Sequence, residues 1–233
     1  SKSFESNKVL LNQGQLKAYL NKFESFKNLS RSDLEAINLI FETAPANKIS
    51  VTANYIKTRD VINMVYLEDI IKTFEKLYKI KNDNEKQWQN FFGKHSWILN
   101  HIFPFDVILN EQEAYVGGKT IKNKDGRVVD FLFTNGFKDN YALLEIKTHN
   151  KKLLKKNPYR KPDVFAYSDD LSGGISQCLD QKDTFIKDFG QKKNMLNPRS
   201  ILIIGKKEDL DEHQIKCFEL LRNNQKNVEI VTF

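Results

Sequence analysis

Two acids and a lysine in the middle of the chain have types and a spacing suited to metal-dependent chemistry. Asp130 lies in one apolar run, and Glu145 and Lys147 lie in the next, with a cluster of turn formers at 135–140 between them. Two carboxylates held close together provide the hard oxygen ligands that Mg²⁺ prefers, and a lysine beside them can stabilise developing negative charge. This combination is typical of a metal-dependent catalytic site. The alternative is a salt bridge across two strands on a solvated face of a sheet.

The two apolar runs predict a β-hairpin, because β-branched and aromatic residues flank an Asn/Gly/Asp cluster. The runs cover residues 128–134 and 141–147. A register centred on the turn places Leu132 opposite Leu143. The same register places Asp130 opposite Glu145, with Lys147 on the same face. The leucines indicate that this face is covered, and burying two acids with one lysine leaves a charge that a metal would neutralise.

Bulk composition favours a polyanionic partner. The chain has 233 residues, a formal net charge of +7 and 40% hydrophobic residues, which is enough for a substantial core. Its polar start has no signal-peptide pattern, and no apolar run approaches the roughly 20 residues needed to cross a bilayer. Cys178 and Cys217 fall at core positions of expected amphipathic helices, so a disulfide is possible but not needed, and a reducing cytoplasm is the default.

The first third of the chain reads as a helical scaffold or interaction region. Apolar residues recur three and four positions apart, which is typical of amphipathic helices. The expected helices cover residues 15–29, 32–41 and 58–79. A joint rich in lysine and asparagine at 79–84 then predicts a domain boundary.

The remainder of the chain alternates between helical and strand patterns. Asn84 is placed to cap a helix over 85–92, and Gly117-Gly118 suggests a bend or a close approach of two backbones. The expected strands cover 105–109, 114–119, the hairpin, 199–205 and 227–233, and further helices cover 169–189 and 211–223. This order predicts an α/β fold with a mixed sheet and helices on both faces.

The order of elements and the pattern Asp130…Glu145-Ile146-Lys147 resemble the PD-(D/E)XK nuclease superfamily. That resemblance implies a restriction-endonuclease-like mixed β-sheet flanked by helices, an αβββαβ core. Finer blocks look like the Shedu anti-phage nuclease domain: EKQWQNFF from residue 85, GRVVDFL from 126, LEIK from 144 and LSGGISQ from 171. The resemblance therefore implies a nuclease domain over 81–233, preceded by a helical N-terminal regulatory or assembly region over 1–80.

The resemblance also assigns roles to individual residues. It implies catalytic roles for Asp130, Glu145, Lys147, Glu85 and Gln177. It implies a Mg²⁺ site, in which Mn²⁺ can substitute, built from Asp130, Glu145, the Ile146 carbonyl and Glu85. Taken alone, Glu85 could simply be a favourable dipole partner in a first helical turn, and Gln177 a solvated glutamine. Val129 stands where the superfamily name has proline, a position that is commonly replaced.

A basic run follows the hairpin. It holds Lys151, Lys152, Lys155, Lys156, Arg160 and Lys161, with no acid before Asp163. We expect these cations to contact nucleic-acid phosphates beside the site, with His149 near a phosphate if the strand continues that far. The alternative is a solvated charged loop.

The sequence thus leads us to expect a Mg²⁺-dependent DNA endonuclease of anti-phage defence, acting on phage or plasmid DNA. The resemblance implies a homo-oligomer, a tetramer, and the cysteine usage and the lack of a long apolar run lead us to expect a cytoplasmic protein with no membrane association. Another PD-(D/E)XK enzyme of restriction or repair is the alternative within the same class. A nuclease-like fold that binds nucleic acid without cleaving it is the alternative of a different class.

Overall fold

The computed structural model describes residues 53–103, 107–118, 126–135, 140–190, 195 and 197–233. The chain divides into two compact units, Ser1–Glu75 and Lys76–Phe233. The helices expected over 15–29 and 32–41 lie outside the described residues. The site argued from the sequence lies wholly within the second unit.

The long helix α3, Ala53–Lys79, begins five residues earlier than the apolar periodicity predicts. It ends at the predicted lysine- and asparagine-rich joint, with Lys76 and Lys79 in its last turn, where cations complement the helix dipole. In the described part of the chain, no helix combines the length and apolarity required to span a bilayer.

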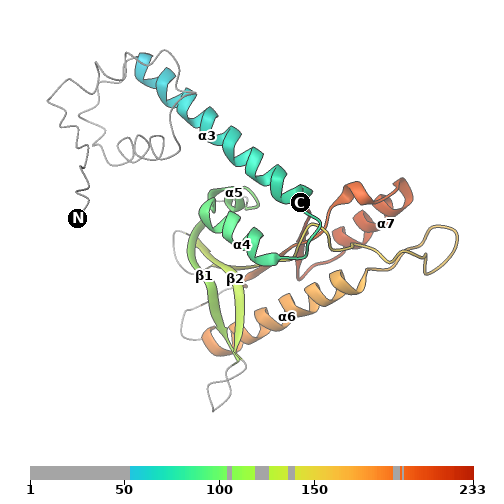
Figure 1. Cartoon of the computed structure of the whole chain (residues 1–233). Coiled ribbons are helices and arrows are strands. Elements are labelled where there is room, and N and C mark those ends of the chain that lie inside the picture. The colour runs from blue at the N-terminus through green and yellow to red at the C-terminus, as the bar shows by residue number, and fades with distance from the viewer. Residues whose placement is uncertain (1–52, 104–106, 119–125, 136–139, 191–194, 196) are drawn as a thin grey trace, which may run out of the picture. The chain divides into compact units, whose positions relative to one another are not determined.

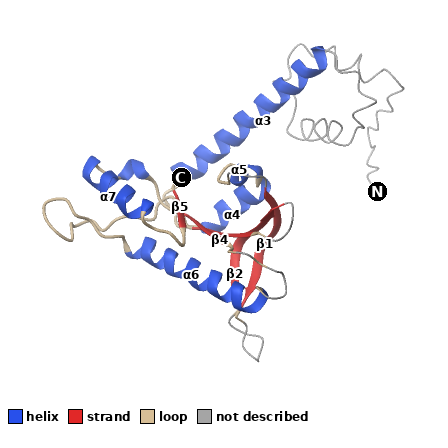
Figure 2. Cartoon of the chain, turned by 180° about the vertical axis from the view of Figure 1, so that it is seen from behind, coloured by secondary structure: helices blue, strands red, loops and turns tan. Residues whose placement is uncertain are grey.

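A five-stranded mixed sheet organises the second unit (Figures 1 and 2). Its strands are β1 Val107–Gly117, β2 Arg127–Asn135, β3 Tyr141–Ile146, β4 Arg199–Ile203 and β5 Glu229–Val231. They lie side by side in chain order, antiparallel from β1 to β3 and parallel from β3 to β5. β3 is buried at every position, because it has a strand on each side and helices on both faces.

The first strand corrects the sequence prediction. We expected separate strands over 105–109 and 114–119, whereas one strand runs from Val107 to Gly117. The polar residues between the two predicted strands are accommodated because β1 is an edge strand with a register shift between Leu109 and Glu111. The glycine bend at its end is confirmed. A Cβ on Gly117, whose φ is +110°, would lie 2.4 Å from an Asp188 oxygen.

The β2–β3 hairpin confirms the predicted register near the turn but not at its open end. Leu132 pairs with Leu143 as expected, and the ladder ends at the pair Phe131–Leu144. Asp130 is therefore not the ladder partner of Glu145. Its carboxylate oxygen Oδ2 instead accepts the Ile146 backbone N–H at 2.7 Å, so the side chain replaces a main-chain partner where the strands separate.

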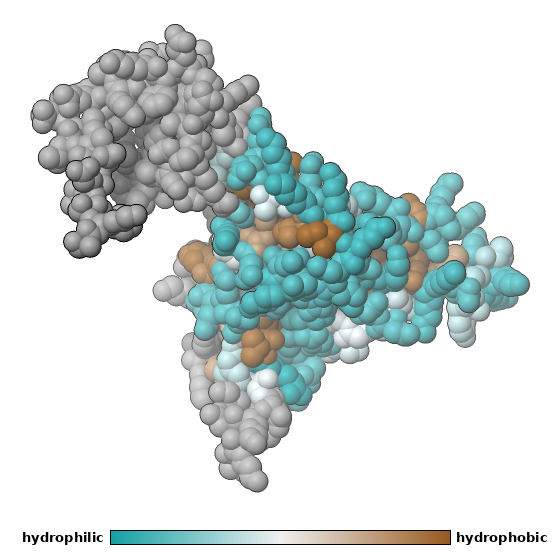
Figure 3. Space-filling model, viewed as in Figure 1, coloured by the Kyte–Doolittle hydropathy of each residue, from teal (hydrophilic) through white to brown (hydrophobic). Residues whose placement is uncertain are grey.

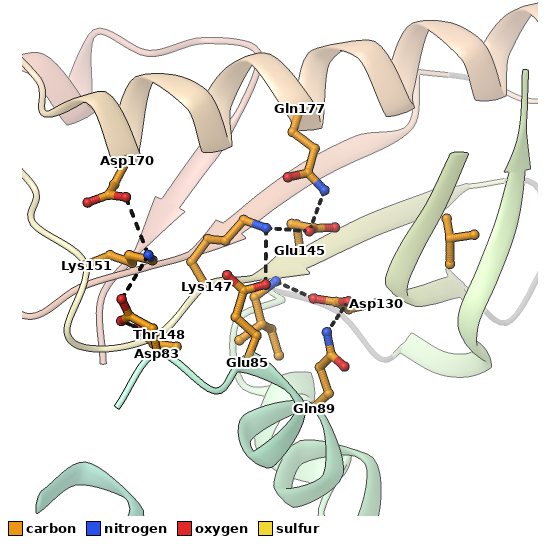
Figure 4. Close-up of polar contacts among 12 residues, drawn as sticks. Asp83, Glu85, Gln89, Asp130, Glu145, Lys147, Thr148, Lys151, Asp170 and Gln177 are labelled. Atoms are coloured by element: carbon orange, nitrogen blue, oxygen red, sulfur yellow. Dashed lines mark hydrogen bonds and ion pairs between the residues drawn. The ribbon is translucent and has the colours of Figure 1, made fainter. Parts of the chain in front are cut away.

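Two helices cover opposite faces of the sheet beside the hairpin (Figure 4). α4, Glu85–Lys94, buries Trp88, Phe91 and Phe92, and the short α5, Trp97–Asn100, follows it. Asn84 stands at the predicted cap of α4, but its side chain makes no capping hydrogen bond. α6, Asp169–Phe189, has the predicted bounds and lies across the other face.

Packing of α6 depends on a narrower apolar stripe than the sequence indicated. Leu171, Ile175, Cys178 and Phe185 are buried, whereas Leu179 and Ile186 remain exposed. Gly174 allows the helix to approach β4, because a Cβ there would lie 2.8 Å from the side chain of Leu202. The polar Gln181 occupies a buried place on this helix, which matters for the site.

The final helix, α7 Glu212–Asn223, begins with a capping box in which the Asp211 carboxylate accepts the Gln214 backbone N–H. A short 3-10 turn, Lys207–Asp209, precedes it. Phe218 of α7 joins the core formed by α6, β4 and β5, which includes Leu202 and Ile230. The thiols of Cys178 and Cys217 are both free. The outer face seen in Figure 3 is mostly hydrophilic, with small separated apolar patches.

Candidate active site

Three elements bring the predicted acids and the lysine together (Figure 4). Glu85 is the first residue of α4, Asp130 lies in β2, and Glu145 lies near the end of β3. Lys147 follows β3, where its backbone N–H donates to the Ile203 carbonyl of β4 at 2.8 Å. That bond continues the parallel pairing and fixes the position of the lysine after the strand has ended.

The Lys147 ammonium lies between two carboxylates. Its Nζ is 3.0 Å from Oε1 of Glu145 and 3.4 Å from Oε2 of Glu85. Only 17% of its side chain is exposed. Burial lowers the pKa of Lys147, but the charges and hydrogen bonds of Glu145 and Glu85 outweigh that effect and leave the pKa above its usual value. The lysine is therefore a cation at neutral pH.

Glu145 is held by two amides of α6 as well as by the lysine. Gln177 Nε2 donates to its Oε1 at 2.6 Å, and Gln181 Nε2 donates to its Oε2 at 2.9 Å. The Gln181 amide nitrogen also lies 2.9 Å from the Val128 carbonyl of β2. Since the Glu145 side chain is only 5% exposed, these donors replace water around a buried carboxylate.

Asp130 is held from the opposite face of the sheet. Gln89 Nε2 of α4 donates to Oδ1 at 2.7 Å, and the Ile146 backbone N–H donates to Oδ2. Burial, followed by the charge of Glu145, raises the pKa of Asp130 to about 7. The hydrogen bond from Ile146 and the charge of Lys147 act in the other direction without cancelling the rise.

The site contains more acid than base. Glu85, Asp130 and Glu145 contribute three carboxyls against the single ammonium of Lys147. Burial is the largest cause of the raised pKa of Asp130, and the charge of Glu145 adds to it, so a bound divalent cation would favour the ionised carboxylate. Among the described residues, however, no three His, Cys, Asp or Glu side chains are grouped closely enough to hold a metal as they stand.

The hydrogen bonds show how much of each carboxylate remains available. Each carboxylate oxygen can accept about two partners. Oε1 of Glu145 already accepts from Lys147 and Gln177, whereas its Oε2 and both oxygens of Asp130 each accept from one donor among the described residues. The donor set therefore fits a hard divalent ion, with both oxygens of Asp130 and Oε2 of Glu145 able to accept one further partner each.

Sequence reasoning missed Gln89 and Gln181, the amides that hold the two acids. Each lies four residues after a residue that was identified, Glu85 and Gln177 respectively, so each pair lies on one face of its helix. The four-residue spacing could have identified both glutamines from the sequence. Neutral glutamines give no charge pattern, and a glutamine on the apolar face of α6 is easily taken for a solvated one.

The structure does not bring His149 to the carboxylates. The side chain is buried and packs among aromatic rings, with its ring centroid 5.1 Å from that of Tyr78. Its Nδ1 accepts the Trp88 indole N–H at 3.2 Å, so the ring is neutral, and burial lowers its pKa. The role expected for His149 required β3 to continue as far as that residue, whereas the strand ends at Ile146.

Half of the basic run is paired with acids from distant segments. Lys151 Nζ lies 3.2 Å from an Asp83 oxygen and 3.6 Å from Asp170. The Thr148 hydroxyl also donates to Asp83, so this group links the segment before α4, the segment after β3 and the start of α6. The other two pairs are Lys152–Asp209 at 2.9 Å and Lys155–Asp169 at 3.0 Å.

Comparison with known proteins agrees with the resemblance noted in the sequence. A family model described as the C-terminal region of the Shedu protein SduA matches residues 82–233. The Shedu protein SduA of Bacillus cereus (strain B4264) is 31% identical over 223 residues, covering 90% of this chain and 53% of the relative. The chain thus spans about half the length of that curated relative.

Proposed function

The chain belongs to the Shedu family, and from that premise we propose that it is a metal-dependent DNA endonuclease of an anti-phage defence system. The observation that carries the proposal is the acid-rich site in which Asp130, Glu145 and Glu85 surround Lys147. The mixed sheet with α4 and α6 on opposite faces supports assigning it to the PD-(D/E)XK superfamily, with its αβββαβ core.

The metal would be held by Asp130 and Glu145, with the Ile146 carbonyl as a further oxygen and Glu85 assisting. When bound, Mg²⁺ or Mn²⁺ supplies Lewis-acid stabilisation of the phosphoryl oxygens and activates a water molecule. Glu85 lies on the more open side, since 32% of its side chain is exposed against 5% for Glu145. It is thus better placed than Glu145 to orient a water or an outer ion.

Lys147 acts as an electrostatic stabiliser in this scheme. A lysine whose pKa is raised keeps its proton at neutral pH and cannot serve as a general base. Its ammonium, positioned by Glu145 and Glu85, can stabilise negative charge that develops on the phosphate. Gln177 and Gln181 orient Glu145, and Gln89 orients Asp130, so the carboxylates stay close despite their repulsion.

The proposal also covers the partners. DNA of a phage or plasmid is the substrate, and the active form is a cytoplasmic homo-oligomer, a tetramer, assembled or regulated by the helical N-terminal region. Light scattering coupled to size-exclusion chromatography measures the assembly state directly. A monomer at micromolar concentration would contradict that part of the proposal and leave the chemistry of the site unaffected.

Plasmid cleavage with Mg²⁺ or Mn²⁺ tests the enzyme. Asp130→Ala and Lys147→Ala should each reduce nicking by at least about 100-fold, because each removes a group that stabilises the transition state. Lys187→Ala is the matched control, since the ion pair that this exposed lysine of α6 makes within the described part of the chain is with Asp183, one helical turn away. Full activity of Asp130→Ala or Lys147→Ala would contradict the assigned roles.

Thermal unfolding with and without Mg²⁺ separates the nuclease from a non-cleaving nucleic-acid-binding module. A metal that binds only the folded chain raises its melting temperature. We expect that rise in the wild type and its loss in Asp130→Asn, which keeps the shape of the side chain. DNA binding with neither cleavage nor a Mg²⁺-dependent rise would favour the binding module. Cleavage at one fixed sequence would favour a restriction enzyme.

A further inference from the structure

The segment between β3 and α6 contains a small arm, residues 154–167, built by its own backbone hydrogen bonds. An antiparallel bridge between Leu154 and Tyr167 closes its base. Near the tip, the Tyr159 N–H donates to the Val164 carbonyl at 2.8 Å, and the Val164 N–H donates to the Arg160 carbonyl at 3.0 Å. The arm therefore has a defined hairpin-like course.

The base of the arm is anchored in the core. Leu153 and Leu154 are buried in the cluster that contains Phe218 of α7. The Phe165 N–H lies 3.3 Å from the Cys217 sulfur, which ties the returning limb to the same helix. Figures 1 and 2 show the arm projecting beyond the ends of α6 and α7, as the gold loop in Figure 1. Its tip is thus held away from the globular body.

The tip presents an aromatic ring surrounded by cations. The Tyr159 side chain belongs to a residue that is 85% exposed, which is far above any other large hydrophobic or aromatic residue described. Lys156, Arg160 and Lys161 are exposed and have no acidic partner within the part of the chain that the structure describes. The single acid of the arm, Asp163, faces His213 of α7 at 3.5 Å.

We propose that the arm is a nucleic-acid-binding element in which Tyr159 stacks on an unpaired base and Lys156, Arg160 and Lys161 bind the adjacent phosphates. This inference rests on the proposed function and deepens it by assigning the arm a preference for single-stranded regions of the DNA. Aromatic rings stack on every base type, and cationic side chains track the backbone without reading sequence. In the free protein the Tyr159 ring stays in contact with water, and it leaves water only when a base stacks on it.

The arm and the carboxylate site lie within reach of one DNA strand. Lys155, at the base of the arm, pairs with Asp169 at the start of α6. Eight residues of that helix separate Asp169 from Gln177, or about 12 Å at 1.5 Å per residue. Tyr159 is four residues beyond Lys155, at most about 14 Å further. About eight nucleotides of one strand, at 3.4 Å each, cover these two lengths together, and the Lys155–Asp169 pair between them adds the reach of two side chains.

Fluorescence anisotropy with labelled single-stranded and blunt duplex oligonucleotides, in EDTA, tests the arm on the whole chain. Tyr159→Ala should weaken single-strand binding by about 5- to 150-fold, which corresponds to 1–3 kcal/mol per stacked base. It should leave the salt dependence unchanged, because no charge is lost. Tyr159→Phe, which keeps the ring, should bind like the wild type, and the blunt duplex should be affected less by Tyr159→Ala.

The three cations of the arm should affect a different quantity, the salt dependence of DNA binding. Replacing Lys156, Arg160 and Lys161 together with Gln should reduce the slope of log affinity against log salt by about 2, since each phosphate contact on a single strand contributes about 0.7. Lys187→Gln, an exposed lysine on α6, controls for loss of surface charge and should leave the slope unchanged.

Several results would overturn the inference. Wild-type affinity in Tyr159→Ala, an equal loss for single strand and duplex, or Tyr159→Phe as weak as Tyr159→Ala would each exclude base stacking. An unchanged salt slope in the triple variant would exclude the phosphate contacts. Failure of the nuclease proposal looks different: the wild type would bind DNA through Tyr159 yet cleave no plasmid with any metal. Cleavage by a protein whose binding ignores Tyr159 would contradict the arm alone.

Discussion

The carboxylate site and the arm are joined by a short stretch of chain, yet they hold their charges in opposite ways. In the site, Glu145 is almost buried and every oxygen of Asp130 and Glu145 accepts a protein donor. On the arm, the charged groups of Lys156 and Arg160 face solvent without an acidic partner among the described residues. The site must hold its carboxylates in place before a ligand binds, whereas the arm presents unpaired positive charge to a ligand.

The change from paired to unpaired cations falls inside one basic run, residues 151–161. Lys151, Lys152 and Lys155 are neutralised by acids that are distant in sequence, such as Asp83 and Asp209. A count of lysines in the sequence therefore overstates the charge available to DNA. The cations beyond Lys155 are the ones left for a polyanion.

The largest effect we expect in comparing the two regions concerns Asp130. At pH 8 and without metal, Asp130→Asn should be more stable than the wild type by up to about 4 kcal/mol, since each pKa unit corresponds to about 1.4 kcal/mol. Asparagine can still accept from the Ile146 N–H, and Gln89 can turn its amide oxygen towards the new NH₂ group. Urea unfolding in EDTA at several pH values measures the difference.

The sign follows from the raised pKa of Asp130. Below pH 4 the carboxyl is protonated in both the folded and the unfolded chain, so it has no pH-dependent effect. Between pH 4 and 7 the unfolded chain loses this proton while the folded chain keeps it, so stability falls as pH rises. Above pH 7 the penalty is constant. Equal stabilities of variant and wild type at pH 8 would show that neither burial nor the charge of Glu145 penalises the ionised Asp130 carboxylate.

A somewhat smaller effect is expected for Gln181→Leu. It removes the donor to the buried Oε2 of Glu145 and to the part-buried Val128 carbonyl, at a cost of about 3 kcal/mol in unfolding free energy. Gln177→Leu is the matched control on the same helix. It should cost about 1 kcal/mol, because Gln177 is half-buried and Oε1 of Glu145 keeps Lys147. Urea unfolding that ranks the two variants in the reverse order would contradict the assigned roles.

The smallest effect compares a paired and an unpaired lysine of the basic run. Lys151→Gln should lower the unfolding free energy by about 1 kcal/mol, because it breaks contacts with Asp83 and Asp170. Lys156→Gln should change stability by less than about 0.5 kcal/mol. Chemical denaturation at low and high salt measures both, and salt should reduce the Lys151 effect. A larger loss of unfolding free energy in Lys156→Gln than in Lys151→Gln would contradict the assignment of Lys151 as paired and Lys156 as unpaired.

Sequence patterns predicted most of the second unit because its elements carry strong local signals. The turn cluster between the apolar runs predicted the β2–β3 hairpin, and apolar periodicity together with flanking polar residues predicted α6 with its observed bounds. The edge strand β1 was divided in two because a polar stretch at a strand edge looks like a loop. Local pattern cannot report a register shift that a neighbouring strand tolerates.

Within the candidate site, the acids and the lysine were found because charge in an apolar run is conspicuous. The structure places Glu85, Asp130, Glu145 and Lys147 together, and it adds the unforeseen Gln89 and Gln181. Those amides depend on tertiary contacts between helices and strands far apart in the chain. The position of His149 was misjudged for a related reason: the end of β3 is set by its neighbours, not by its own residues.

The bridge between Leu154 and Tyr167 has one more consequence, for protein engineering. Paired strands lie only about 5 Å apart, so the two ends of the arm can be joined by a tight turn. The segment 156–164 can accordingly be exchanged for a tight turn, or for a hairpin grafted from another protein, while Leu153, Leu154 and Phe165 stay in place against the core. The fold thus carries an exchangeable segment on an otherwise fixed mixed α/β scaffold.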